Sequence, residues 1–292
     1  MRRHQLTEGM IRLALGMAAS TSILIVLLIF LFLIKEAAPF LKNPGLSALL
    51  GDRWMPVSFQ KQSFGIVPLV TGSALVTLLA TLIAIPFGVC GAVYLSEVAA
   101  AAEREFLKPF IELLAGIPSV VIGFFGLIVL APLVKQVFGL QTGQIALTGA
   151  LLLALMAIPT IISISEDAIR SVPTSYKEAS LALGASQLQT IWRITVPAAL
   201  PGIVAAVMLG MGRVIGETMA VLMVTGNAAI TTLSPFDSVR TMTATIAAEM
   251  GEVPFGSDHY RALFWIGIVL LIATFGINLV AQKVLKRYRM AP

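Results

Sequence analysis

Long apolar runs separated by short polar stretches dominate the hydrophobic pattern of this 292-residue chain. A helix that crosses a bilayer needs about 20 mainly apolar residues, because the hydrocarbon core is about 30 Å thick. Six runs meet that length, at approximately residues 11–34, 66–95, 110–134, 144–165, 199–225 and 262–283. The pattern therefore predicts an all-α fold, a polytopic membrane bundle of six transmembrane helices.

The first run is expected to remain in the protein as a membrane anchor. Its uncharged stretch from Leu13 to Ile34 has 22 residues, whereas the apolar region of a secretory signal peptide has about 7–15. The chain is then expected to divide into an N-terminal anchor with an outer loop (1–65), a core of five spans (66–285) and a cytoplasmic tail (286–292).

Composition agrees with a membrane protein and excludes several other classes. Hydrophobic residues make up 58% of the chain and charged residues only 12%, about half the charged fraction of ordinary soluble domains. The net charge of +5 comes from basic residues at the ends of apolar runs, which is not the basic face of a nucleic-acid-binding protein. Cys90 is the only cysteine, and His4 and His259 lack ligand spacing, so we expect no disulfide framework and no metal site.

The distribution of Lys and Arg predicts the orientation in the membrane. If the N-terminus is cytoplasmic, 12 of the 20 basic residues lie on the cytoplasmic side and 7 on the outer side, and Arg213 lies within a span. Because short cytoplasmic loops are enriched in Lys and Arg, this bias favours both termini inside. The rule is statistical, so the inverted topology stays open.

The loop at 166–197, predicted to be cytoplasmic, carries a helix-start signal. Ser175 and Glu178 have the spacing of a capping box, which predicts a helix from Tyr176. Gly184 is expected to end or bend this helix, because glycine tolerates a positive φ.

A second short helix is predicted from Ser186 to Ile194, closed by Pro197. Helices this short are marginal on their own in water. The loop therefore needs a surface to pack on, and a partner protein is one such surface.

This loop resembles the signature of permeases of ABC-type importers: Glu-Ala-Ala, three residues, Gly, nine residues, Ile-x-Leu-Pro. Both spacings are present here, with two mild departures at Ser180 and Val196, in the groups Glu178-Ala179-Ser180, Gly184 and Ile194-Thr195-Val196-Pro197. The resemblance implies a coupling helix that inserts into a groove on an ATPase subunit, with an interface formed by Glu178, Ala179, Ser180 and Gly184. A role of Glu178 as a helix cap stays open beside it.

The chain has no Gly-x-x-x-x-Gly-Lys-Ser/Thr stretch, the motif whose backbone N–H groups cradle nucleotide phosphates. We therefore expect it not to be an enzyme. It binds no cofactor in this interpretation, and ATP and Mg are used by a separate ATPase.

Two opposite charges lie in the fifth predicted span. An Arg at a helix centre costs about 2.5–3.5 kcal/mol on insertion scales, so Arg213 needs an explanation. Glu217 follows four residues later, which in a continuous helix places both on one face. Small residues at spacings of four surround them and predict close helix packing; they are Gly202, Ala206, Gly210, Gly212 and Gly216.

Two interpretations of the charged pair stay open. In one, Arg213 and Glu217 neutralise each other and lock the bundle. In the other, Arg213 offers positive charge to an anion that crosses the membrane and Glu217 tunes it. A guanidinium suits this task because it stays charged and presents a fork of donors to an oxyanion.

The fifth span also resembles phosphate-importer permeases of the PstC type. Their motif is matched by Arg213–Val221, and further similarity occurs at 93–99, 115–127, 242–250 and 259–281. The resemblance implies that Arg213 and Glu217 line the substrate path. Met219-Ala220 departs from the Gly-Glu-Thr-Ala-Pro of the sister permease, so the first type is favoured.

Pro118, in the third predicted span, is a candidate gate hinge, because proline kinks helices. A packing bend without a gating role is the alternative.

Taken together, the residues and the resemblance predict a permease subunit of an ATP-driven phosphate importer in the bacterial inner membrane, with a fold like that of type I ABC importer permeases. The implied partners are a sister permease, two ATPase subunits and a periplasmic or lipoprotein phosphate-binding protein, which is expected to contact the outer loops at 35–64 and 226–260. Alternatives are an ABC permease for another oxyanion such as sulfate or molybdate, the sister permease itself, and an ion-coupled secondary transporter or channel. A membrane enzyme lacks support, because no cluster of catalytic residue types occurs.

Overall fold

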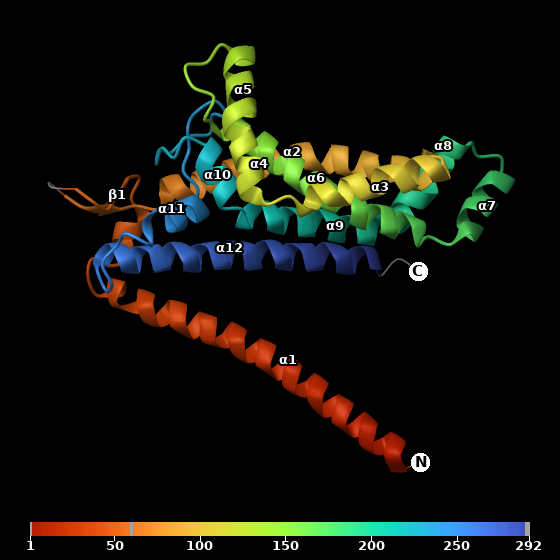
Figure 1. Ribbon diagram of the computed structural model, residues 1–292, viewed down its shortest axis with the longest axis horizontal. Helices are drawn as coiled ribbons and strands as arrows, with labels where there is room; N and C mark the ends of the chain where they lie inside the picture. The colour runs from red at the N-terminus through yellow and green to blue at the C-terminus, as the bar shows by residue number, and fades with distance from the viewer. Residues whose placement is uncertain (1, 59–60, 290–292) are drawn as a thin grey trace.

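The computed structural model of the protein describes residues 2–58 and 61–289. Almost all of its regular structure is helical (Figure 1). A short antiparallel hairpin pairs β1 (Trp54–Met55) with β2 (Ser63–Phe64). The helices and helical turns are α1 (Arg2–Ala37), η1 (Ala38–Leu41), η2 (Leu46–Leu50), α2 (Val67–Val93), η3 (Tyr94–Val98), α3 (Ala101–Gly116), α4 (Ser119–Phe125), η4 (Gly126–Leu130), α5 (Ala131–Phe138), α6 (Ala146–Arg170), α7 (Thr174–Ala182), α8 (Gln187–Thr190), η5 (Ile191–Thr195), α9 (Val196–Gly216), α10 (Met219–Val224), α11 (Met242–Glu249) and α12 (Asp258–Arg289).

Six helical segments are long and apolar enough to cross a membrane, which confirms the predicted number of spans. They are Ile11–Leu41, Val67–Val98, Ser119–Phe138, Ala146–Arg170, Gln187–Gly216 and Asp258–Val280. The all-α fold predicted from the hydrophobic pattern is also confirmed.

Helix α6 forms the centre of the bundle, between α2 and α9. In the most apolar stretch of 18 residues in α6, 61% of the residues are buried, whereas none is buried in the corresponding stretch of α1. The contact with α2 is built from small side chains, which let two helix backbones approach closely. They include Ala80 and Ala84 of α2 and Ala150, Ala154 and Ala157 of α6. Close packing of these residues fixes α2 and α6 against each other in the core of the bundle.

The C-terminal end of helix α1 contacts α12, and the N-terminal part of the helix lies away from the bundle (Figure 1). There Phe32 meets Phe264 of α12 edge to face, and the indole of Trp265 donates a hydrogen bond to the carbonyl of Ala37 over 2.9 Å. The remaining apolar length of α1 is exposed, so lipid or another membrane subunit must cover it.

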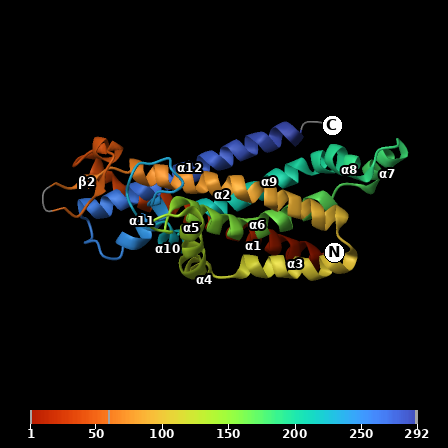
Figure 2. The same cartoon turned by 90° about the horizontal axis from the view of Figure 1, so that it is seen from above.

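The third predicted span, 110–134, is wrong in its boundaries. The amphipathic helix α3 ends at Gly116, and the apolar segment begins only at Ser119. Ile117 has an extended backbone, the conformation that a following proline favours because its ring disfavours the helical region. Pro118 thus separates two helices instead of bending one. Figures 1 and 2 show that α4 and α5 run across the direction of α2, α6 and α9.

The fifth predicted span, 199–225, is also wrong at its C-terminal end. Helix α9 stops at Gly216, the backbone is extended at Glu217, and the short helix α10 follows from Met219. The helix continues upstream instead, through η5 and α8, so the prediction that Pro197 closes a second short helix is wrong. The π-helical turn η5 lies directly before Pro197, and such a local change of hydrogen bonding accommodates the missing N–H of a proline.

The N-terminal end of α1, the C-terminal end of α12 and helix α7 all lie at one end of the molecule (Figure 2). The hairpin and α11 lie at the other end. This arrangement agrees with the prediction that both termini and the 166–197 loop are on the same side of the membrane.

Candidate functional site

Arg213 lies in the last turn of α9 and faces the C-terminal end of α3. Its Nη2 donates a hydrogen bond to the carbonyl oxygen of Ala115 at 3.0 Å, and its Nη1 lies 3.5 Å from the hydroxyl oxygen of Thr160 on α6. The side chain is half-buried. Three helices therefore fix the position of this cation.

No carboxylate among the described residues lies within ion-pair distance of Arg213. Its polar partners are a neutral hydroxyl and a carbonyl at the C-terminal end of α3, where the helix dipole carries a partial negative charge. Partial charges compensate a full positive charge only in part. The site is therefore suited to a mobile anion.

Glu217 does not pair with Arg213, so the prediction that both lie on one helical face is wrong. The reason is the end of α9 at Gly216, which places Glu217 in the following turn. Its Oε1 accepts a hydrogen bond from the backbone N–H of Ala220 at 3.3 Å, and its carbonyl accepts one from the hydroxyl of Thr243 at 2.8 Å. Glu217 thus joins α10 and α11 to the end of α9.

The small residues of α9 divide into two groups. Ala206 is fully buried, and a Cβ added to Gly202 or Gly210 would lie 2.3 Å from Ala168 or 2.8 Å from Ile161 of α6. These three residues therefore pack closely, as predicted. A Cβ added to Gly212 or Gly216 would meet nothing within 4 Å, so this second group faces away from the described chain.

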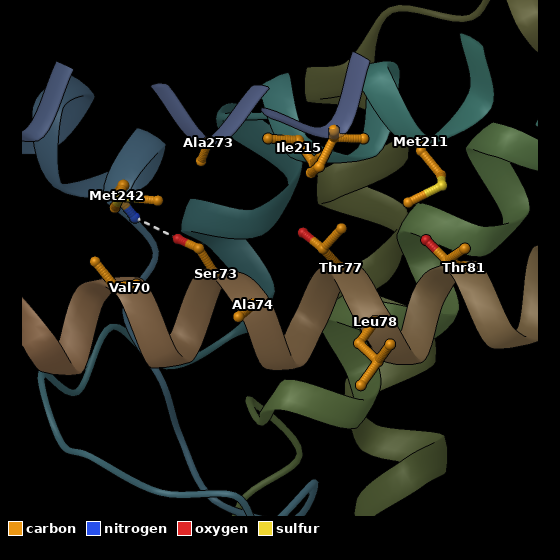
Figure 3. A pocket seen from close by; sticks show the side chains of 11 residues that line it. Val70, Ser73, Ala74, Thr77, Leu78, Thr81, Met211, Ile215, Met242 and Ala273 are labelled. Carbon is orange, nitrogen blue, oxygen red and sulfur yellow. Dashed lines mark hydrogen bonds between the residues drawn. The ribbon is translucent and has the colours of Figure 1, made fainter. Parts of the chain in front are cut away.

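A cavity of about 360 Å³ lies on another side of α9, between α2, α9 and α12 (Figure 3). Its lining is apolar except for the hydroxyls of Ser73, Thr77 and Thr81, and Ser73 already accepts a hydrogen bond from the backbone N–H of Met242. A multiply charged anion needs full charge compensation in such surroundings. The residues that line the cavity include no cation.

The predicted docking loop folds into α7 and α8 at the end of the molecule (Figure 1). Helix α7 buries no residue, and Glu178 and Ala179 are exposed. Leu183 is 89% exposed and Leu188 is 65% exposed. Exposed apolar side chains such as these are available for contact with another protein or with membrane lipid.

The helix boundaries of the loop differ from the prediction. Helix α7 starts at Thr174 after Pro173 and has no side-chain cap, so the capping box at Ser175 and Glu178 is absent. A capping box forms instead at the start of α8, where Ser186 and Gln189 exchange hydrogen bonds. The Ser-x-x-Gln spacing carries this signal in the sequence, and our sequence analysis missed it.

Gly184 has a φ of +87° and ends α7, as predicted. Ser180 does not face outward, because its hydroxyl shares a hydrogen bond of 2.9 Å with Thr190. This bond ties α7 to α8, so Ser180 holds the shape of the loop.

Two partly buried ion pairs near this loop were not predicted from the sequence. Nζ of Lys177 on α7 lies 2.6 Å from Oε1 of Glu97 in η3, the turn that follows α2. Nζ of Lys108 on α3 lies 2.5 Å from Oε2 of Glu166 on α6. The hydrogen bond to Glu166 raises the pKa of Lys108 above its ordinary value. The acidic residues at the ends of apolar runs were visible in the sequence, but their partners are distant in it.

The opposite end of the molecule carries a charged cluster around Glu249. Its carboxylate accepts hydrogen bonds from the indole of Trp54 at 3.1 Å and from Nη1 of Arg240 at 2.6 Å, and it lies 2.8 Å from Nε2 of His259. Burial alone raises the pKa of Glu249, but the hydrogen bonds from His259 and Trp54 and the charge of Arg240 outweigh it and lower the pKa. A cleft of about 430 Å³ opens beside the cluster.

Comparison with known proteins adds family evidence to this geometry. The profile of the family described as binding-protein-dependent transport system inner membrane component matches residues 84–288. The probable ABC transporter permease protein YqgH of Bacillus subtilis is 43% identical, over 81% of this chain and 80% of that protein. The phosphate transport system permease protein PstC of Mesorhizobium japonicum is 33% identical, over 98% and 92%.

Solved structures of similar fold include a permease chain of a bacterial alginate ABC transporter, bound to a periplasmic protein that holds an alginate pentasaccharide. The TM-score is 0.66 at 17% identity, and the match covers 94% of each chain. An inward-facing MetNI methionine ABC transporter gives a TM-score of 0.58 at 18% identity, over 76% of this chain and 96% of the other. These similarities confirm the predicted fold of an ABC importer permease.

Proposed function

Because the chain belongs to the family of binding-protein-dependent transport system inner membrane components, we propose that it forms the translocation path for inorganic phosphate in an ATP-driven importer. It is a multi-pass membrane protein and a permease subunit. The phosphate specificity is supported by the names of several relatives that are 31–34% identical.

The observation that carries the proposal is Arg213, a half-buried cation without an ionic partner among the described residues. Its guanidinium is anchored through two of its nitrogens to helices α3 and α6. A phosphate that arrives from outside supplies the missing negative charge, and the fork of N–H donors matches its oxygens. Glu217 acts on the path by holding the turn after α9 in place.

The remaining parts follow from the two ends of the molecule. The surface of α7 with Glu178, Ala179 and Gly184 docks on an ATPase subunit that uses ATP and Mg, and it lies in the cytoplasm together with both termini. The face of α9 at Gly212 and Gly216 meets a sister permease. The hairpin and the Glu249 cluster meet a phosphate-binding protein. In this account residues 1–65 anchor the translocation core, and Pro118 marks a hinge between α3 and α4.

Uptake of labelled phosphate into vesicles that contain the assembled importer tests the proposal. Arg213→Ala should reduce uptake to background while the subunits still assemble, because the path then offers no cation. Lys135→Ala, which removes an exposed cation from α5, serves as the control and should leave uptake unchanged. Uptake by Arg213→Ala at the level of the unmodified protein would contradict the proposal. Competition by sulfate or molybdate as strong as that by phosphate would assign another oxyanion to the same path.

A further inference from the structure

Helix α3 is fixed in the structure by charged and polar contacts. It buries no side chain, and its principal packing partner is α6. Such a helix gains little from hydrophobic burial. Its attachment therefore depends on a few polar contacts, at its middle and at its C-terminal end.

Midway along its length, at Lys108, α3 is bound to the buried carboxylate of Glu166 on α6. The side chain of Glu166 is 1% exposed, and it contacts Lys108 at 2.5 Å and Arg170 at 3.4 Å. Lys108 also contacts Asp167 at 3.0 Å. A buried carboxylate that loses its partner is strongly unfavourable, so Glu166 and Lys108 stay together when either helix moves.

This attachment lies next to the docking loop. Arg170 is the last residue of α6, and the chain enters the loop immediately after it. The ion pair of Lys177 with Glu97 joins α7 to the segment that precedes α3. A displacement of α7 is therefore passed to α3 both through the end of α6 and through η3.

The C-terminal end of α3 reaches the candidate anion site. The carbonyl of Ala115, one residue before the end of the helix, accepts the hydrogen bond of Arg213. The 16 residues of α3 span about 24 Å at 1.5 Å per residue. One continuous helix thus connects the docking end of the molecule to the guanidinium.

We propose that α3 is a strut that transmits movement of the docking loop to Arg213, and that Lys108 is the positioning residue that attaches this strut to α6. The inference rests on the proposed function, because it assigns the loop to the ATPase and Arg213 to the anion. Without Lys108, the loop still docks and ATP is still hydrolysed, but α3 no longer follows and the guanidinium is not repositioned in each cycle.

The test measures phosphate uptake and ATP hydrolysis in the same vesicles of assembled importer. Lys108→Met should raise the ATP hydrolysed per phosphate by about fivefold or more, the lower end of ordinary coupling between two sites. Lys108→Arg keeps the cation and should restore the ratio. Arg261→Met breaks a partly exposed ion pair with Asp258 at the other end of the molecule and should leave the ratio unchanged. An unchanged ratio of ATP hydrolysed to phosphate transported in Lys108→Met would contradict the proposal that Lys108 couples α3 to the docking loop.

A second measurement covers the case in which Lys108→Met does not assemble. In a Cys90→Ser background, spin labels at Glu112→Cys on α3 and Ile272→Cys on α12, both exposed positions, report the distance between the two helices. Adding ATP to the otherwise unmodified importer should shift this distance, and an unmoved distance would contradict the strut. The two proposals can fail separately. If Arg213→Ala leaves uptake unchanged while ATP still shifts the distance, the assignment of the anion to Arg213 is wrong but the movement of α3 is retained.

Discussion

The guanidinium of Arg213 donates a hydrogen bond to the carbonyl oxygen of Ala115 across 3.0 Å, although the two residues are 98 positions apart in the chain. This bond joins the last turn of α9 to the end of α3. The negative end of the α3 dipole stabilises the cation without neutralising it. Only some of the guanidinium donors are used by these contacts, so the others are available to a ligand.

Packing between α9 and α6 makes a prediction about two glycines of the same helix. Gly202→Ala places a Cβ 2.3 Å from Cβ of Ala168, so the purified protein should lose about 1–3 kcal/mol of stability through overpacking. Gly212→Ala meets nothing within 4 Å and should be neutral or stabilising by up to about 1 kcal/mol, because alanine favours helices. Thermal unfolding of both variants measures the difference, and equal melting temperatures would show that this contact is absent.

The Glu249 cluster predicts a loss of order at acidic pH. The pKa of this carboxyl is lowered from 4.5 in the folded protein, so its contribution to stability is fully present above that value. The contribution disappears as the pH falls through the lowered pKa, because protonation removes the ionic contacts with Arg240 and His259. Hydrogen exchange of α11 should therefore accelerate below about pH 4.5. In Glu249→Gln this acceleration should be missing, and an unaltered profile would assign it to other groups.

The docking loop predicts a separation of two activities. Glu178→Arg reverses a charge on the exposed face of α7, so binding of the ATPase should weaken while the permease itself still folds. The phosphate-stimulated part of ATP hydrolysis should fall about tenfold, the effect of some 1.4 kcal/mol at an interface. Lys135→Glu, which reverses a charge on an exposed residue of α5 outside the docking loop, is the matched control. Stimulation that survives in Glu178→Arg would place the ATPase contact elsewhere.

Cysteine labelling tests the orientation of the chain. Leu188 is 65% exposed on α8, and Leu188→Cys in a Cys90→Ser background has a single thiol. An impermeant maleimide should label it only when the cytoplasmic face is accessible. Labelling from the outside of intact cells would invert the topology and place the docking loop on the wrong side for an ATPase.

The number and approximate position of the spans could be predicted because membrane insertion depends on local hydropathy, which the sequence displays directly. Hydropathy does not show where a continuous helix ends. Ile117 and Pro118 end a helix through backbone sterics, and Glu217 ends one by capping the next helix at Ala220. Both breaks lie inside apolar runs, so the runs alone predict helices that are too long.

The candidate site could be predicted only in part, for a related reason. The cost of burying a charge made Arg213 conspicuous in the sequence. Its actual partner is a backbone carbonyl of α3, and no side-chain pattern encodes such a partner. The pairing of Lys108 with Glu166 likewise depends on how α3 lies on α6, which is a tertiary relationship.

Contact between substrate phosphorus and the guanidinium is the most direct test of the account. The importer is prepared with ¹⁵N-labelled arginine and loaded with phosphate, and the ³¹P–¹⁵N dipolar coupling is measured by solid-state NMR. The account predicts a coupling that is present in the unmodified protein and absent in Arg213→Lys. A coupling that persists unchanged in Arg213→Lys, or none in the loaded unmodified protein, would contradict the assignment of Arg213 to the phosphate path.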